Sequence, residues 1–164
     1  MSRRCSLLAV PFVLGAVAAG LVGLAHGALG ATHCKDVSGT LTSTANFGNF
    51  TTQGTISGSL KGSTFFTGDA SSLAPVTASS SPPLNPTDAY TGDLAITTKK
   101  GVLKTRSVGV FELVPNGFGT EFDRVLGGHS TGKFSGATGH LYFNFQSDAT
   151  GSVFTSTYTG QICS

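Results

Sequence analysis

A short unit built around glycine recurs along this chain and limits what it can fold into. In each copy a polar residue precedes the glycine, any residue follows it, and an aliphatic residue comes next. The copies are Ser38–Leu41, Gln53–Ile56, Thr91–Leu94, Thr138–Leu141, Thr150–Val153 and Thr159–Ile162. Their irregular spacing excludes a solenoid repeat. We expect each copy to mark the start of a strand in an antiparallel meander.

Around these units apolar and polar residues alternate. This two-residue repeat is typical of a strand with one face buried. The clearest case follows a glycine-rich reversal at 127–139, where Leu141, Phe143 and Phe145 share one face and Tyr142 lies on the other. No helical period appears after the first thirty residues. The pattern therefore predicts an all-β domain.

Seven segments carry the strand pattern. They are Val37–Ala45, Gly54–Thr67, Ala89–Thr98, Val102–Val114, Phe118–Leu126, His140–Ser147 and Ser152–Ile162. Between them, Lys99–Gly101 and Pro115–Gly117 consist of residues typical of turns. Ser71–Thr87 holds four of the six prolines. Because prolines interrupt the hydrogen bonding of a strand, we expect a long loop here, and its composition favours a connector over a lid.

The number and order of these strands predict an antiparallel up-and-down (calycin-like) barrel of about eight strands over residues 31–164, with a sandwich as the alternative. Cys34 and Cys163 lie near the two ends of this domain. In an exported protein we expect them to form a disulfide, with two free buried thiols as the alternative. A bridge between the first and last strands favours a barrel, because closure places those strands side by side.

Residues 1–30 have the pattern of an export signal. Arg3 and Arg4 precede an apolar run over 7–25, and Ala28–Gly30 offers small residues to a signal peptidase. A retained membrane anchor is the alternative, and the route of export, general or twin-arginine, stays open. The signal predicts a secreted or periplasmic protein.

The charges indicate few partners. The formal net charge is +2, but Arg3 and Arg4 leave with the signal, and eight basic residues then balance eight acidic ones. Without a basic stripe, we expect neither nucleic-acid binding nor strong membrane binding after signal cleavage. Cys34 and its neighbour His33 are too few ligands for zinc, and the glycines of 132–139 open a strand, not the helix of a dinucleotide site. We predict no metal and no cofactor.

The glycine-rich reversal resembles a family signature. Gly127-Gly128 and Thr131–Gly139 are similar to the Gly-Gly-Thr-Gly-x-Phe-x-Gly-Ala-x-Gly signature of the allene oxide cyclase and dirigent barrels, with His129-Ser130 inserted. The resemblance covers about residues 90–163 and is nearest to small exported bacterial relatives of these barrels. It implies a β-barrel, and homo-oligomers like the dimers and trimers of the plant members. It transfers no catalytic residue, because the catalytic residues of those enzymes lie outside the signature.

Charged residues in the predicted strands are candidate catalytic groups. Glu112, Asp123 and Arg124 would orient or polarise an apolar ligand if they met at a barrel mouth. The alternative is a solvated cross-strand ion pair of Glu112 with Arg106 or Arg124, which would contribute little. Glu121 shares one strand face with Asp123.

Aromatic residues are candidate ligand-binding groups. Phe111, Phe122, Phe143 and Phe145 would line an apolar pocket if their strand faces turn inward, and the alternative is an ordinary core. In the strand that carries Phe111, the face of Phe111 is the more apolar one, which places Glu112 outside or at a rim.

These observations favour an exported barrel without catalysis that binds an apolar or aromatic small molecule. The resemblance implies two alternatives, a cyclase or isomerase acting on a fatty-acid-derived epoxide and a dirigent-like guide of radical coupling. A cyclase predicts a deep pocket with a polar group of shifted pKa at its floor. A purely structural barrel predicts an interior filled by Leu, Ile and Phe.

Overall fold

The computed structural model describes residues 33–76 and 86–164. Its strands are β1 (Cys34–Asn46), β2 (Thr51–Gly58), β3 (Gly62–Gly68), β4 (Ala74–Pro75), β5 (Thr87–Thr98), β6 (Gly101–Glu112), β7 (Phe118–Val125), β8 (Thr138–Ser147) and β9 (Val153–Cys163). The helical elements of these two ranges are three single-turn 3-10 helices, η1 (Ala70–Ser72), η2 (Gly127–His129) and η3 (Gly132–Phe134). No helix there has the length and apolar character needed to cross a membrane. The signal predicted at 1–30 lies outside the described residues.

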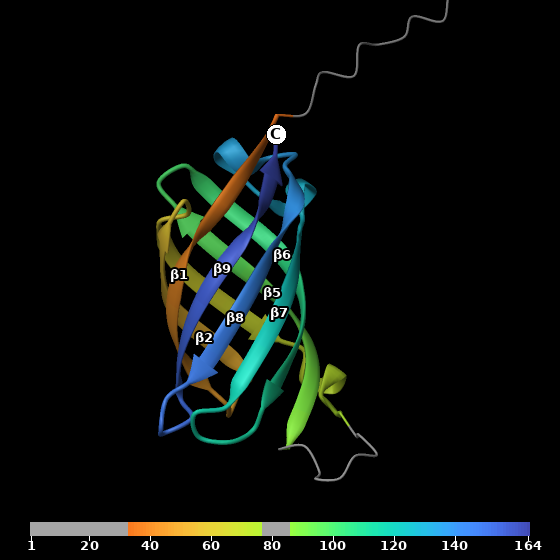
Figure 1. The fold of residues 1–164 in the computed structure, drawn as a ribbon. Coiled ribbons are helices and arrows are strands. Elements are labelled where there is room, and N and C mark those ends of the chain that lie inside the picture. Colours follow the sequence, from red (N-terminus) through yellow and green to blue (C-terminus); the bar gives the residue numbers. More distant parts are fainter. Residues whose placement is uncertain (1–32, 77–85) are drawn as a thin grey trace, which may run out of the picture. The chain divides into compact units, whose positions relative to one another are not determined.

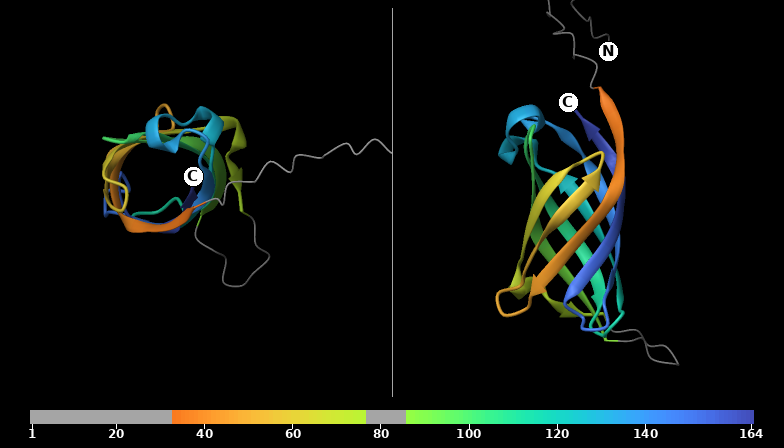
Figure 2. Two further views of the ribbon diagram at one scale, coloured as in Figure 1. Left: turned by 90° about the horizontal axis from the view of Figure 1, so that it is seen from above. Right: turned by 90° about the vertical axis from the view of Figure 1, so that its left-hand side faces the viewer.

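The strands close into an eight-stranded antiparallel barrel (Figures 1 and 2). The strands pair in the order β3-β2-β1-β9-β8-β7-β6-β5, and β3 pairs with β5 to complete the ring. Apart from the pairing of the first strand with the last, each strand of the ring pairs with the strands that precede and follow it in the ring along the chain. The two-residue β4 lies beside the first residues of β5 and is not part of the ring. The predicted all-β, up-and-down barrel is therefore confirmed.

A disulfide joins the first strand of the barrel to the last. Cys34 lies directly opposite Cys163 in the pairing of β1 with β9, and the two sulfurs are bonded. The predicted pairing is confirmed, and such a bridge is typical of proteins that fold in an oxidising compartment. Both ends of the domain are thus held at one end of the barrel (Figure 1).

The single strand predicted over Gly54–Thr67 was wrong, because the chain reverses within it. β2 ends at Gly58, which has a φ of +93°, and β3 begins at Gly62. Ile56 and Leu60 are both buried and have the same parity, so the alternation continues through the turn and hides it. The backbone N–H of Leu60 donates to the hydroxyl of Tyr158 at 2.9 Å, which fixes the turn against the barrel interior.

The glycine units begin strands less often than expected. Four of the six lie within strands β1, β2, β5 and β9, while the units at 138–141 and 150–153 lie at the starts of β8 and β9. The physical reason is clearest at Gly39, where an added Cβ would lie 2.7 Å from the ring of Tyr158. A glycine in mid-strand thus leaves room for an aromatic ring that leans over from the neighbouring strand.

Alternation places the expected faces inside. Leu141 and Phe143 are buried in the barrel, whereas Tyr142 between them is 46% exposed on the outside. At the end of the barrel near the termini, Ile96 and Leu103 are fully buried opposite one another in the pairing of β5 with β6. This end is filled by packed side chains.

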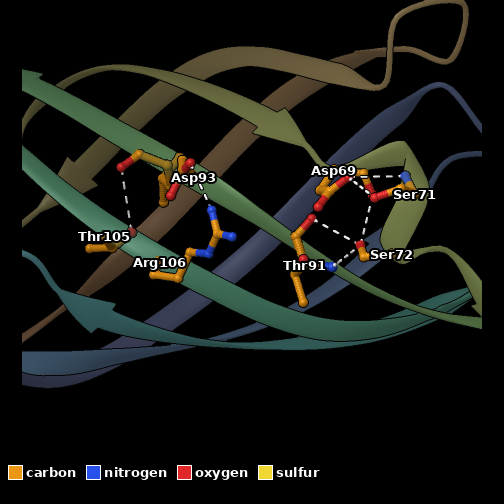
Figure 3. A network of polar contacts seen from close by, with 8 residues as sticks. Asp69, Ser71, Ser72, Thr91, Asp93, Thr105 and Arg106 are labelled. Carbon is orange, nitrogen blue, oxygen red and sulfur yellow. Dashed lines mark hydrogen bonds and ion pairs between the residues drawn. The ribbon is translucent and has the colours of Figure 1, made fainter.

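The start of the proline-rich segment is fastened to the outside of β5 (Figure 3). Oδ1 of Asp69 accepts hydrogen bonds from the backbone N–H and the hydroxyl of Ser71, at 3.0 and 2.6 Å. The Ser72 hydroxyl accepts a 2.7 Å hydrogen bond from the backbone N–H of Thr91. Residues 77–85, the middle of the predicted connector, lie outside the described residues.

Candidate functional site

A cavity of about 90 Å³ occupies the barrel interior toward the end that carries the β1–β2 turn. Its wall is rich in aromatic residues, which are Phe47, Phe50, Phe66, Tyr90, Phe111, Phe143, Phe145 and Phe154, and also includes aliphatic residues and short polar ones such as Ser43 and Thr52. The lining reaches the β1–β2 turn, where Phe47 is 56% exposed, so this end of the cavity faces solvent. Such a concave apolar site is typical of small-molecule binding.

Tyr90 is the centre of the aromatic wall. Its ring makes edge-to-face contacts with Phe66, Phe111 and Phe50, at centroid separations of 5.8, 5.6 and 6.2 Å. These are the distances and angles that aromatic pairs prefer. The contacts come from three sides and fix the direction in which the Tyr90 hydroxyl points.

The Tyr90 hydroxyl donates a 2.5 Å hydrogen bond to Oε2 of Glu121. In the strand pairings Tyr90 lies opposite Gly109, and Gly109 lies opposite Glu121. A Cβ on Gly109 would lie 2.6 Å from both Cζ and the hydroxyl oxygen of Tyr90. The glycine therefore allows the tyrosine to reach across β6 to a carboxyl on β7.

Glu121 is the acidic residue of the cavity wall. Among the described residues lining the cavity there is no Lys, Arg or His. Burial raises the pKa of Glu121 well above its usual value, and the charge of the nearby Asp123 raises it further, while the hydrogen bond from Tyr90 opposes both. Burial likewise raises the pKa of Tyr90, with the charge of Glu121 adding to the effect, so the phenol keeps its proton and remains a donor.

A second carboxyl lies deeper, on the same strand face. Asp123 is fully buried and its Oδ2 accepts a 2.9 Å hydrogen bond from the Thr105 hydroxyl. Burial raises its pKa, and the neighbouring Ser107, Glu121 and Thr105 oppose that shift. Oδ1 of Asp123 and the hydroxyl of Ser107, which lie opposite one another in the strand pairing, have no hydrogen-bond partner of good geometry. We infer that the acid pair retains a proton at a pH where an exposed carboxyl has lost it.

Three of the four predicted ligand-binding aromatics line the cavity. Phe111, Phe143 and Phe145 point inward, as the alternation indicated. Phe122 lies instead on the outer face of β7, is 39% exposed, and contacts Tyr142 at a centroid separation of 5.1 Å. It is not a cavity residue.

The three predicted catalytic candidates do not meet. Asp123 points into the barrel, and the adjacent Arg124 is exposed on the outside, because successive residues of a strand face opposite ways. Glu112 lies at the end of β6, where its Oε2 accepts a 2.9 Å hydrogen bond from the backbone N–H of Phe118. On the outer face Arg106 forms an ion pair with Asp93 at 2.9 Å (Figure 3).

Sequence reasoning missed the polar pair at the floor of the cavity. Glu121 shares a strand face with Asp123 and Val125. The apolar side chain of Val125, which is buried in the structure, was the one signal in the sequence that this face turns inward. Tyr90 carried no comparable signal, since its partner is thirty-one residues away on a strand with which β5 does not pair.

Within 33–76 and 86–164, no three His, Cys, Asp or Glu side chains gather in a way that would hold a metal ion. No family model, curated protein or solved structure matches this chain. The functional argument therefore depends on the geometry of the cavity.

Proposed function

We propose that this protein is an exported barrel that binds a small apolar or aromatic molecule in its aromatic cavity. The observation that carries the proposal is the cavity itself, in which a wall rich in aromatic residues includes a carboxyl hydrogen-bonded to Tyr90. Apolar walls with one or two placed polar groups are the usual design of a small-molecule site. A structural barrel would fill this end with side chains, as the opposite end is filled.

The volume of the cavity favours a compact ligand. About 90 Å³ has room for several water molecules or for part of a ring. An engineered apolar cavity that takes up benzene is larger, about 150 Å³, so a bound ring would extend toward the open end of this cavity. A longer ligand would place one end in the cavity and the remainder at the mouth beside Phe47. A single ring or a short chain end is therefore the ligand class we expect.

Two observations support a secreted or periplasmic location for this activity. The first thirty residues have the charge and apolar pattern of a signal peptide. The disulfide between Cys34 and Cys163 is of the kind that persists outside the reducing cytosol.

A cavity-filling variant tests the proposal. Ala45 lines the cavity, whereas Thr44, the preceding residue of β1, is exposed on the outside. We expect Ala45→Trp to abolish binding of ethylbenzene and 2-phenylethanol, measured by calorimetry on the mature domain, and Thr44→Trp to leave it unchanged. Failure of the unmodified domain to bind any small aromatic compound would overturn the proposal.

A cyclase or isomerase similar to allene oxide cyclase is the second candidate. The observation that favours it is the carboxyl of Glu121, held by Tyr90 at the floor of an aromatic cavity with its pKa raised by burial. Such a neutral carboxyl would give its proton to the epoxide oxygen, and the carboxylate left behind would steady the positive charge that develops on the substrate. Incubation with a fatty-acid-derived epoxide tests it. Product formation above the uncatalysed rate, lost in Glu121→Gln, is the expected result, and a rate equal to the uncatalysed one would exclude it.

A further inference from the structure

We propose that the cavity selects small aromatic or alkyl amines in their ammonium form, with the ammonium group seated on Glu121. This inference rests on the proposed function and names the class of ligand for the same site. It is carried by the charge, the aromatic surface and the unpartnered polar atoms of the barrel interior.

The first step is the charge of the interior. Glu121 and Asp123 both point into the barrel, and the described residues that line the cavity include no basic side chain. A buried carboxylate is costly unless a cation or a proton compensates it. A cationic ligand would supply that compensation, whereas a fatty acid or another anion would bring negative charge to the two buried carboxyls.

The second step is the aromatic wall. Phe66, Tyr90, Phe111 and Phe143 line the same cavity as Glu121. The faces of aromatic rings carry partial negative charge and attract ammonium groups. The apolar part of an amine would bury its surface against the remaining rings. A carboxyl surrounded by aromatic rings is thus matched to a molecule with a cationic head and an apolar body.

The third step is the unpartnered atoms beneath the carboxyl. Oδ1 of Asp123 and the hydroxyl of Ser107 opposite it are buried and make no hydrogen bond of good geometry, although Ser107 and Glu121 both act on the pKa of Asp123. An ammonium group has three donors and no acceptor. Glu121 offers it one acceptor at the cavity wall, and these two oxygens, which do not line the cavity, lie behind that wall as further acceptors.

Binding must then displace a proton. The neutral carboxyl of Glu121 loses its proton to solvent, and the resulting carboxylate pairs with the ammonium, so total charge balances. The titratable groups that act on Glu121 are Tyr90 from β5 and Asp123 from its own strand, while β6 and β8 present Ser107, Gly109 and Phe143. Because burial raises the pKa of Glu121, the affinity for an amine increases with pH as long as the amine itself stays protonated.

Three ligands of matched shape test the inference on the mature domain. They are 2-phenylethylamine, the neutral 2-phenylethanol and the anionic 3-phenylpropionate. At about pH 8 we expect the amine to bind at least about tenfold more tightly than the alcohol, because a charge-assisted hydrogen bond replaces a neutral one, and the carboxylate to bind most weakly. Calorimetry in buffers of different ionisation enthalpy should detect proton release for the amine alone.

Two variants assign the effect to Glu121. We expect Glu121→Gln to weaken amine binding at least about tenfold and to remove its proton release, with a smaller effect on 2-phenylethanol. Asp93→Asn removes an exposed carboxyl on the outside of β5 and should change neither affinity. If Glu121→Gln fails to fold, the pH dependence of amine binding to the unmodified domain tests the same assignment. An affinity that increases with pH supports it, and an affinity that does not change with pH would contradict it.

The outcomes separate the two proposals. An alcohol that binds as tightly as the amine, with no proton release, would overturn the amine assignment and support the general aromatic site. A domain that binds none of the three would overturn both.

Discussion

The hydroxyl of Tyr90 lies 2.5 Å from Oε2 of Glu121, although the strands that carry these residues do not pair with one another. The strand between them places Gly109 under the tyrosine ring. One hydrogen bond thus spans three strands and joins the aromatic wall of the cavity to its carboxyl. The geometry of the site consequently depends on Gly109, a residue that has no side chain.

Gly109→Ala should displace the Tyr90 ring. The added Cβ would lie 2.6 Å from ring atoms that Phe66 and Phe111 already hold in place. We expect the free energy of unfolding to fall by about 1–3 kcal/mol, the usual cost of overpacking a core, measured by urea denaturation. Gly128→Ala is the matched control, since an added Cβ there meets no atom within 4 Å. Equal stability of the two variants would contradict the account.

Stability should fall as pH rises above the ordinary pKa values of carboxyl groups. The pKa of Glu121 and that of Asp123 are raised in the folded state, mainly by burial, so the folded domain holds protons that the unfolded chain releases. This contribution is fully present below the unfolded pKa values and is lost as pH rises through the folded ones. The urea midpoint of the unmodified domain should therefore decrease from acid toward alkaline pH.

Glu121→Gln should flatten that pH profile and raise the urea midpoint at alkaline pH, because an uncharged amide does not have to be ionised inside the barrel. Asp93→Asn, on the exposed outer face, should keep the slope of the unmodified domain. The exposed Asp69 and Asp148 have lowered pKa values through hydrogen bonds to nearby serine and threonine groups, so their contribution has the opposite sign and is lost only in acid. Profiles of equal slope in Glu121→Gln and the unmodified domain would rule out Glu121 as the source.

Removal of the disulfide should destabilise the domain strongly. The bridge closes a loop with a sequence separation of 129 residues. The chain-entropy model gives about 4–5 kcal/mol for a loop of this length. We expect the double variant Cys34→Ser, Cys163→Ser to lose about that much, and the reduced unmodified domain to match it in urea denaturation. An unchanged midpoint on reduction would show that the strand pairing of β1 with β9 is sufficient alone.

The Tyr158 hydroxyl should contribute to the stability of the packed end of the barrel, near the termini. It accepts a hydrogen bond from the backbone N–H of Leu60 at 2.9 Å and donates one to the carbonyl of Ser57 at 3.0 Å. Tyr158→Phe leaves the buried N–H of Leu60 without this partner, which should cost about 1–3 kcal/mol in urea denaturation. Tyr142→Phe removes a hydroxyl on the exposed outer face and should have little effect. Similar losses in both variants would count against a specific role for this contact.

Much of the fold was predictable because alternation is a local property. Leu141, Phe143 and Phe145 could be assigned to one face without knowledge of any other strand. The same rule failed at 59–61, since the buried residues Ile56, Leu60 and Phe66 keep one parity across the turn. For the site, alternation placed Phe111 inside, whereas Phe122, predicted as a ligand-binding residue, lies on the outer face of its strand.

The order of residues along the chain was enough to determine the class of fold, the two faces of each strand and the sulfur pair that joins the first strand to the last. Only the tertiary structure decided that Tyr90 meets Glu121 and that one end of the barrel is filled while the other is hollow. These contacts depend on how closure staggers the strands and on which rings lean across glycines. That stagger is a property of the whole ring, and no single segment encodes it.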